Sequence, residues 1–385
     1  MHVCVAYDCL YPWTVGGAER WYRGLAEELV AAGHEVTYLT RLQWEPGCAP
    51  RLPGIRVFPV SPREPLYTDD GRRRVGETLR FGLGVLRHLL RHRRDYDAVH
   101  LSSFPYFSLL AARAALALTG RRVFVDWLEV WTHSYWREYL GALGGTAGWA
   151  VQRLCVLLTP EAFVFSRLHE RRLRQEGFRG PATVLTGLYD GPIAALGDAT
   201  HEEPLVVFAG RHVPEKRAHL VPEAVARARA AGVPDLRGLV LGDGPERNRV
   251  LATTAGFGME GAVETPGFVD SKQVRDALRR ASCLILPSVR EGYGLVIIEA
   301  AACGTPSVVS PAPDNAAVEL IQDGVNGFVA TGGGATELGD AIVRVVEAGP
   351  ALRERTLSWF EENAPKLSLR TSARAALERY ASARS

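Results

Sequence analysis

The stretch EGYGLVIIE, Glu291 to Glu299, decides the fold, because its glycines, Gly292 and Gly294, mark a turn from a strand into a helix, and a glutamate stands at each end of the stretch. The residues before it, SCLILPS from Ser282 to Ser288, form an apolar run typical of a buried strand. The residues after the turn, LVIIEAAACG, predict a helix that ends at Gly304. A strand, a glycine turn and a helix in this order predict an α/β domain.

The same turn predicts an anion site. Glycines let the backbone approach a ligand closely, and the first turn of the new helix offers its amide groups to a phosphate. Glu299 lies one turn beyond Leu295, so its carboxylate can accept hydrogen bonds from vicinal hydroxyls in the same space. We therefore predict a nucleotide-sugar site that comprises Glu291, Gly292, Tyr293, Gly294, Leu295 and Glu299.

Two cations follow an earlier strand, Leu205 to Gly210, in the run LVVFAGRHVPEKRAHL. Arg211 and Lys216 lie in the loop before the next helix, where they could neutralise a diphosphate. Because 42 of the 45 basic residues are Arg, a Lys at this position suggests that a compact ammonium is needed. The alternative is a solvated basic loop, which the pairing with the glutamate turn makes the weaker interpretation.

Strand-like and helical runs alternate along the whole chain, which indicates parallel sheets with crossover helices. A break at residues 191–203 separates two such series, so we expect two doubly wound Rossmann-like domains, residues 1–195 and 196–363, that face one cleft. The predicted strands are 2–6, 35–40, 55–60, 98–103, 122–127, 162–166, 183–186, 205–210, 238–242, 263–268, 283–287, 307–310 and 327–330.

Composition narrows the class of protein. A length of 385 residues suits two domains, and a net charge of +2 gives no general affinity for nucleic acid. The six cysteines show no metal-like spacing, and we expect buried reduced thiols. The chain opens on a strand without a signal sequence and has no uncharged run long enough for a membrane span, so a cytoplasmic protein is expected.

With these motifs in view, the chain resembles the retaining glycosyltransferases of family 4, which have GT-B architecture. The resemblance covers nearly the whole chain, and it implies that residues 1–195 bind the acceptor, that a final helix at 364–385 crosses back onto this domain, and that residues 196–363 bind the donor. It rests on PWTVGGAERW in the N-terminal half and, in the C-terminal half, on AGRHVPEKR, LGDGPER, PGFVD, ASCLILPSVREGYGLVIIEAAACGTPSVVS and DGVNGFVA.

The resemblance adds donor contacts outside the glutamate turn. It implies that Gly16 and Gly17 approach the donor at the start of the first helix, and that the backbone of Phe268 and Val269 borders the nucleotide base. Asp243, in the turn GDGP, could contact the donor or be purely structural.

The segment from Asp126 to Gly141 departs from the family pattern. Many relatives carry a His directly after the fifth strand, where this chain has Asp126, so Asp126, Glu129 and His133 are candidates for a role in the chemistry. An aromatic series at helical spacing, Trp127, Trp131, Tyr135 and Tyr139, indicates core packing or else a platform for the acceptor.

The segment Arg72–Arg94 predicts a basic amphipathic helix. Val75, Leu79, Leu83, Leu86 and Leu90 form one stripe, and Arg80, Arg87, Arg91 and Arg94 form another. Such a helix is usually an ordinary surface helix, but it can also bind an anionic membrane.

These observations predict a retaining, metal-independent transferase, with Arg211, Lys216, Glu291 and Asp126 as the catalytic set and no cofactor. The expected donor is a UDP- or GDP-sugar, and the acceptor is a glycan, glycolipid or natural product; base, sugar, acceptor and oligomeric state stay open. The alternatives are a GT-B sugar-nucleotide epimerase and a non-catalytic nucleotide-sugar-binding protein.

Overall fold

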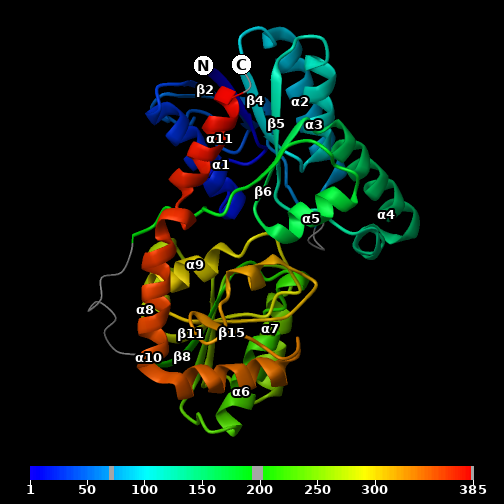
Figure 1. Ribbon diagram of the computed structural model, residues 1–385. Helices are drawn as coiled ribbons and strands as arrows, with labels where there is room; N and C mark the ends of the chain where they lie inside the picture. Colours follow the sequence, from blue (N-terminus) through cyan, green and yellow to red (C-terminus); the bar gives the residue numbers. More distant parts are fainter. Residues whose placement is uncertain (69–72, 193–202, 383–385) are drawn as a thin grey trace. The chain divides into compact units, whose positions relative to one another are not determined.

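The computed structural model describes residues 1–68, 73–192 and 203–382 and divides the chain into two compact units (Figure 1). The first unit contains Met1–Thr68, the described residues up to Asp190, and the C-terminal segment from Ser368. The second unit contains the described residues from Gly191 to Leu367. The chain therefore passes from one unit to the other at Asp190 and at Leu367, near the sequence-based boundaries of 195 and 363.

The first unit is built on a seven-stranded parallel sheet of order β3-β2-β1-β4-β5-β6-β7. Its strands are β1 (His2–Ala6), β2 (Glu35–Arg41), β3 (Ile55–Ser61), β4 (Ala98–Ser102), β5 (Arg122–Trp127), β6 (Glu161–Val164) and β7 (Ala182–Val184). Its helices are α1 (Gly17–Ala31), α2 (Val75–His92), α3 (Tyr106–Leu116), α4 (His133–Leu158), α5 (Arg167–Gln175) and α11 (Leu369–Ser382).

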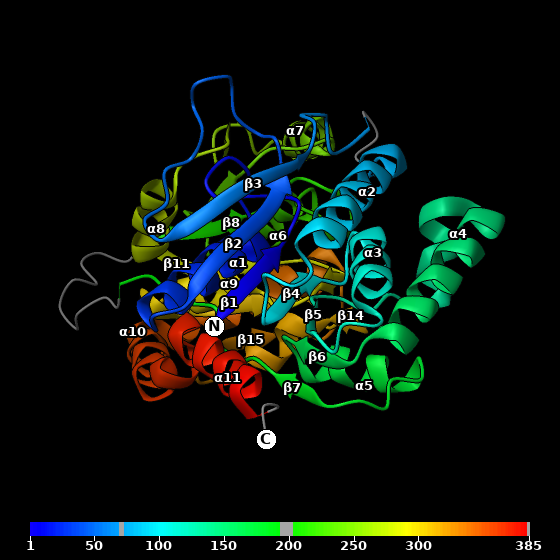
Figure 2. The same cartoon turned by 90° about the horizontal axis from the view of Figure 1, so that it is seen from above.

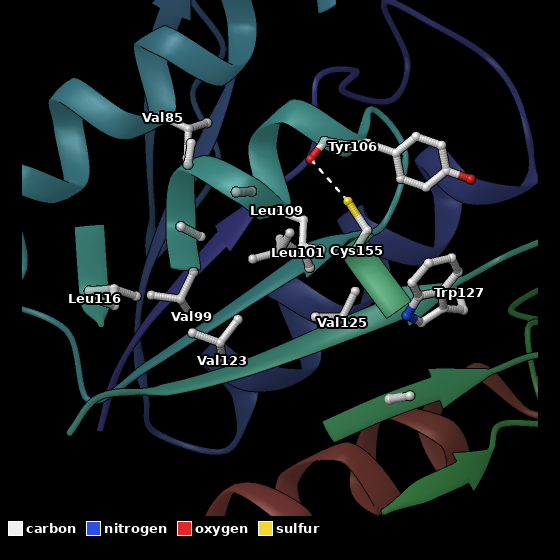
Figure 3. Packing of buried hydrophobic residues seen from close by; sticks show 14 of the residues in the cluster. Val85, Val99, Leu101, Tyr106, Leu109, Leu116, Val123, Val125, Trp127 and Cys155 are labelled. Atoms are coloured by element: carbon white, nitrogen blue, oxygen red, sulfur yellow. Dashed lines mark hydrogen bonds between the residues drawn. The ribbon is translucent and has the colours of Figure 1, made fainter. Parts of the chain in front are cut away.

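A buried apolar layer joins α2, α3 and α4 to one face of this sheet. Figure 3 shows Val99 and Val125 of the sheet packed beside Val85 of α2 and Leu109 of α3. Cys155 of α4 belongs to the same layer, and burial raises the pKa of its thiol to about 12. The three helices follow one another along that face, as Figure 2 shows.

The C-terminal helix α11 belongs to the first unit and packs on α1. The backbone carbonyl of Tyr380 accepts a hydrogen bond from Arg122 Nη1 at 2.7 Å, and its hydroxyl is hydrogen-bonded to His100 Nδ1 in the core. Ser372 Oγ accepts a hydrogen bond from the backbone of Gly187 at 3.0 Å. These contacts attach the last helix to β4, β5 and the segment after β7.

The second unit has a six-stranded parallel sheet of order β10-β9-β8-β11-β13-β15. Its strands are β8 (Glu203–Ala209), β9 (Arg237–Leu241), β10 (Val263–Gly267), β11 (Ala281–Leu286), β13 (Ser307–Val309) and β15 (Gly327–Val329). Its helices are α6 (Leu220–Ala230), α7 (Arg247–Gly256), α8 (Ser271–Arg280), α9 (Leu295–Ala302) and α10 (Ala335–Leu367), with the short 3-10 turns η1 (Pro214–Lys216) and η2 (Ala316–Leu320). Apolar residues of α6 and α10 cover one face of this sheet, and those of α8 and α9 cover the other.

The structure confirms the predicted doubly wound α/β class and the strands of both sheets, with ends that shift by a residue or two. It adds a two-stranded parallel ladder that the sequence did not predict, β12 (Arg290–Glu291) with β14 (Asp314–Asn315). Its first strand, β12, lies directly before the glycine turn.

Five of the six cysteines are buried, as expected, whereas Cys48 is exposed. All six lie within the described residues, and none forms a disulfide. In the part of the chain that the structure describes, no helix is both long enough and apolar enough to cross a bilayer.

Candidate functional site

The glycine turn has the local geometry that the sequence predicts. Glu291 ends β12, and Gly294 precedes the first residue of α9, Leu295. Gly294 has a φ of 100°, and a Cβ atom placed there would lie 2.6 Å from the Cβ of Ala317. Only glycine fits both this backbone conformation and this close approach. The chain can therefore enter α9 abruptly, with the amide groups of the first helical turn next to the turn itself.

Lys216 and Glu291 meet in the second unit, although 75 positions separate them in the sequence. Lys216 Nζ donates a hydrogen bond to Glu291 Oε1 at 2.5 Å, which forms an ion pair. The Lys216 side chain is 22% exposed and that of Glu291 is 8% exposed. The pair therefore lies mostly within the protein while its lysine still reaches solvent.

A frame of hydrogen bonds that sequence reasoning missed holds Glu291 in place. Ser288 Oγ donates to Glu291 Oε1 at 2.8 Å, the same oxygen that Lys216 contacts. Asn315, which pairs with Glu291 in the ladder, donates its amide to the backbone carbonyls of Ser288 and Ser310 at 3.1 and 2.9 Å. Ser288 follows the predicted strand at a Pro-Ser break, which is the only signal the sequence gives for it. Asn315 lies in a loop sequence without any such signal.

The loop after β8 carries the other predicted cation. Arg211 is exposed, directly after the residue that follows β8. The backbone next to it is fixed, because the amide of His212 donates to the carbonyl of Asp243 at 2.8 Å. The carboxylate of Asp243 accepts a hydrogen bond from the amide of Gly244 at 2.8 Å, which is a structural role for this turn. Arg211 thus lies in the loop after β8, which also carries Lys216, and β8 is the neighbour of β11 in the six-stranded sheet.

The remaining predicted donor residues of the second unit differ in exposure. Phe268 follows β10 and is 68% exposed, whereas Val269 is partly buried against the α8–α9 core. Tyr293 is buried, and this burial raises the pKa of its hydroxyl. Glu299 is partly exposed on α9, one turn after Leu295, as predicted. Gly292 lies between β12 and α9 and is partly exposed.

Three predicted site residues, Gly16, Gly17 and Asp126, lie in the first unit. Gly16 is the N-cap of α1 and Gly17 is its first helical residue. Both positions agree with the predicted start of this helix.

Asp126, the third of them, is fully buried on β5. Its Oδ2 accepts a hydrogen bond from Trp21 Nε1 at 2.6 Å, and its Oδ1 lies 2.8 Å from His100 Nε2. Because His100 also contacts Tyr380, Asp126 is part of a buried polar chain that reaches α11. Such complete burial does not favour a role for Asp126 in proton transfer to a substrate.

The other candidates of this segment have different surroundings. Glu129 is partly exposed, and its Oε2 accepts a hydrogen bond from Trp131 Nε1 at 2.7 Å. His133 is exposed at the start of α4, with its ring centroid 4.8 Å from that of Trp149.

The predicted aromatic stripe is wrong as a single helical face. Trp127 ends β5 and is fully buried, and the helix begins only at His133. Trp131, in the loop between them, has its ring centroid 4.8 Å from that of Tyr135 and 5.2 Å from that of Tyr139. The four residues recur at every fourth position by coincidence, although they lie on a strand, in a loop and on a helix. The rings of Trp131, Tyr135 and Tyr139 pack against one another.

Two family models match the chain, one in each unit. The model described as glycosyl transferase 4-like domain matches residues 16–187, and the model described as glycosyl transferases group 1 matches residues 203–348. Together they leave only short segments of the chain unmatched.

Known proteins agree with these two models. The chain is 28% identical over 326 residues to a glycogen synthase of Mycobacterium tuberculosis, covering 78% of this chain and 75% of that protein. Among solved structures, it resembles sucrose-phosphate synthase from Thermosynechococcus elongatus with a TM-score of 0.82 at 19% identity over the full length of both chains. It also resembles Anabaena Alr3699/HepE, solved in complex with UDP-glucose, with a TM-score of 0.73 at 17% identity over 99% of this chain and 100% of that one.

The two structural likenesses concern the fold, and the two family models concern the sequence of each half. The family models match the family that the motifs suggested, and they favour neither an epimerase nor a non-catalytic binding protein. The chain therefore belongs to the GT-B glycosyltransferases of the family 4 type, and it is a glycosyltransferase.

Proposed function

We propose that this glycosyltransferase moves a sugar from a nucleoside-diphosphate sugar to a hydroxyl acceptor, retains the anomeric configuration and needs no divalent metal. The observation that carries the proposal is the ion pair between Lys216 and Glu291 beside the N-terminus of α9. It brings a cation, a carboxylate able to bind hydroxyls and a helix N-terminus together in one unit. A sugar diphosphate presents the complementary groups.

Each group has a separate role in the proposal. Lys216, Arg211 and the amides after Gly294 neutralise the diphosphate as negative charge develops on it. Glu291 accepts hydrogen bonds from the hydroxyls of the transferred sugar, since Lys216 and Ser288 both contact Oε1 and neither contact involves Oε2. Glu299 binds the ribose hydroxyls. Exposed Phe268, with Val269, borders the base, and Gly16 and Gly17 are the proposed donor contacts of the first unit.

The chemical step follows from this arrangement. The bond between the anomeric carbon and the phosphate oxygen breaks, and the acceptor oxygen forms its bond to the same face of that carbon. The departing phosphate oxygen takes the proton of the acceptor hydroxyl, and the nucleoside diphosphate leaves. No dedicated base is needed, which agrees with the buried position of Asp126.

The proposed donor is a UDP- or GDP-sugar, and the proposed acceptor is a glycan, a glycolipid or a natural product. The Anabaena protein of the same fold was solved with UDP-glucose, which makes UDP-sugars the first donors to test. A thermal-shift screen of nucleotide sugars, followed by mass spectrometry with acceptor pools, would identify both substrates.

The configuration of the product tests the mechanism. With an α-linked donor, the anomeric proton of the product should show the coupling constant of an α-linkage by NMR. A β-linked product would contradict same-face transfer and would require a base on the opposite face. If no nucleotide sugar is cleaved in the presence of any acceptor pool, the transfer itself is contradicted.

A further inference from the structure

The exposed side of α2 combines an apolar stripe with a basic stripe. Leu79, Leu83 and Leu90 are 40%, 64% and 49% exposed. At 100° per residue, Arg80, Arg87 and Arg91 form a second stripe directly beside these leucines, and all three are exposed. The sequence showed both stripes, but only the structure shows that the leucines face solvent.

Close packing on the other side of α2 fixes this orientation. Phe81, Val85 and Leu89 are fully buried in the core, and Leu86 is the member of the predicted stripe that packs partly against it. A Cβ atom at Gly84 would collide with the carbonyl oxygen of Val60 on β3, so the helix lies directly against the sheet there. Rotation of α2 to bury its exposed leucines would break this contact.

Exposed leucines also occur on the neighbouring helices of the same layer, whose order along the sheet is seen in Figure 2. Seven of the eight exposed leucines among the described residues lie on α2, at the end of α3 or on α4; they are Leu79, Leu83, Leu90, Leu118, Leu143, Leu154 and Leu157. The three helices bury other residues in the core cluster, whereas these leucines are exposed to solvent. Leu251 in the second unit is the exception.

We propose that this surface, the α2–α4 face, docks on an anionic lipid bilayer. Its exposed leucines would enter the interface between headgroups and acyl chains, while the Arg stripe would contact phosphate groups. The only acidic residue of α2, Glu77, is 3% exposed and so does not oppose an anionic surface. The inference does not depend on the donor or the mechanism proposed above, although a bound bilayer would bring lipid-linked acceptors close to the enzyme.

Charge distinguishes the bilayer from a second copy of this chain. A symmetric dimer through the α2–α4 face would place the same patch of both copies in contact and bring their Arg stripes together. That contact would be repulsive, whereas anionic headgroups attract each Arg by about 1 kcal/mol. Arg80 already forms an ion pair with Glu64, so Arg87 and Arg91 are the better residues to substitute.

Co-sedimentation with lipid vesicles tests the proposal without any sugar donor. The full chain should bind vesicles that contain phosphatidylglycerol and bind pure phosphatidylcholine vesicles much more weakly. Arg87→Gln with Arg91→Gln should weaken binding about 30-fold, the equivalent of about 2 kcal/mol. Leu83→Glu should also abolish most binding, and its high exposure means that the fold should tolerate it.

Matched controls exist on other surfaces. Leu251→Glu on α7 and Arg374→Gln on α11 change exposed residues of the same types and should leave vesicle binding unchanged. Equal binding to neutral and anionic vesicles, or full binding by the two α2 variants, would overturn the proposal. A wild-type dimer that Leu83→Glu converts to a monomer in light scattering, without vesicle binding, would identify the face as an interface between copies and would also overturn it.

Discussion

Replacing Lys216 by Met tests the centre of the proposed site, because it removes the ammonium but keeps most of the aliphatic side chain. Two separate losses are expected. The first is the charge-assisted contact to the diphosphate, which is typically about 1.5–3 kcal/mol and corresponds to a decrease in affinity of about 10- to 150-fold. The second is a loss of stability, because the side chain of Glu291 is only 8% exposed and would lose its cation partner.

The size of the second loss follows from the geometry. Lys216 is 22% exposed and Ser288 still donates to Glu291, so the loss should be smaller than the 3–5 kcal/mol of a fully buried pair. We expect about 2 kcal/mol, which for a unit of this size lowers Tm by about 4–8 °C. Calorimetry would measure the melting temperature and the affinity for the nucleoside diphosphate in the same samples.

A double variant separates the two effects. Lys216→Met combined with Glu291→Gln removes both charges, so stability should recover while diphosphate affinity stays low. Lys272→Met changes an exposed lysine on α8 and serves as the control for a lost positive charge. Wild-type affinity for UDP and GDP in both the single and the double variant would refute the assignment of Lys216 to the diphosphate.

Four further predictions concern the turn, the ribose, the metal and pH. Gly294→Ala should destabilise the protein by more than about 1 kcal/mol, because φ is 100° and the new Cβ meets Ala317. Adding Ala317→Gly removes the contact but not the strain in the backbone, so it should restore only part of the lost stability. Full recovery in denaturant titrations would show that backbone strain is unimportant at this position. Glu299→Gln should weaken binding of the free nucleoside diphosphate, and unchanged affinity by calorimetry would argue against the ribose role. Transfer should persist in excess EDTA, and activity that returns only with Mg²⁺ or Mn²⁺ would rule out the metal-free mechanism. Burial lowers the pKa of His88 to about 4, whereas a histidine in the unfolded chain is protonated below about pH 6.5, so the stability of the protein should decrease as the pH falls from about 6.5 toward 4. His88→Gln should flatten this decrease. An unchanged pH profile of urea unfolding in the variant would contradict the prediction.

The sheets could be predicted because their strands are short apolar runs between helical segments, as in the run from Ser282 to Ser288. The glycine turn could be predicted because Gly292 and Gly294 stand between a strand-like run and a helical run, with Glu291 and Glu299 at the two ends of the stretch. The ladder of β12 and β14 could not, because it is two residues long and depends on the amide of Asn315, which bonds to backbone that is distant in sequence.

Burial was the harder property to predict. In α2, Phe81, Val85 and Leu89 recur at a helical spacing, and so do Leu79, Leu83 and Leu90, so periodicity alone cannot tell the core face from the exposed one. Asp126 was a candidate because it stands where many relatives carry a His directly after the fifth strand. Its partners, Trp21 and His100, come from distant segments and become visible only in the folded chain.

The position of α11 has a consequence for biosynthesis. The first unit begins at the N-terminus, yet its packing is complete only when Leu369–Ser382 has joined α1 and the polar chain of Asp126, His100 and Tyr380. A ribosome must therefore translate the whole second unit before the first can finish folding, although N-terminal domains ordinarily fold first. An isolated fragment that ends at Asp190 would leave this side of α1 uncovered, and it would need residues 368–382 supplied through a linker or as a separate peptide.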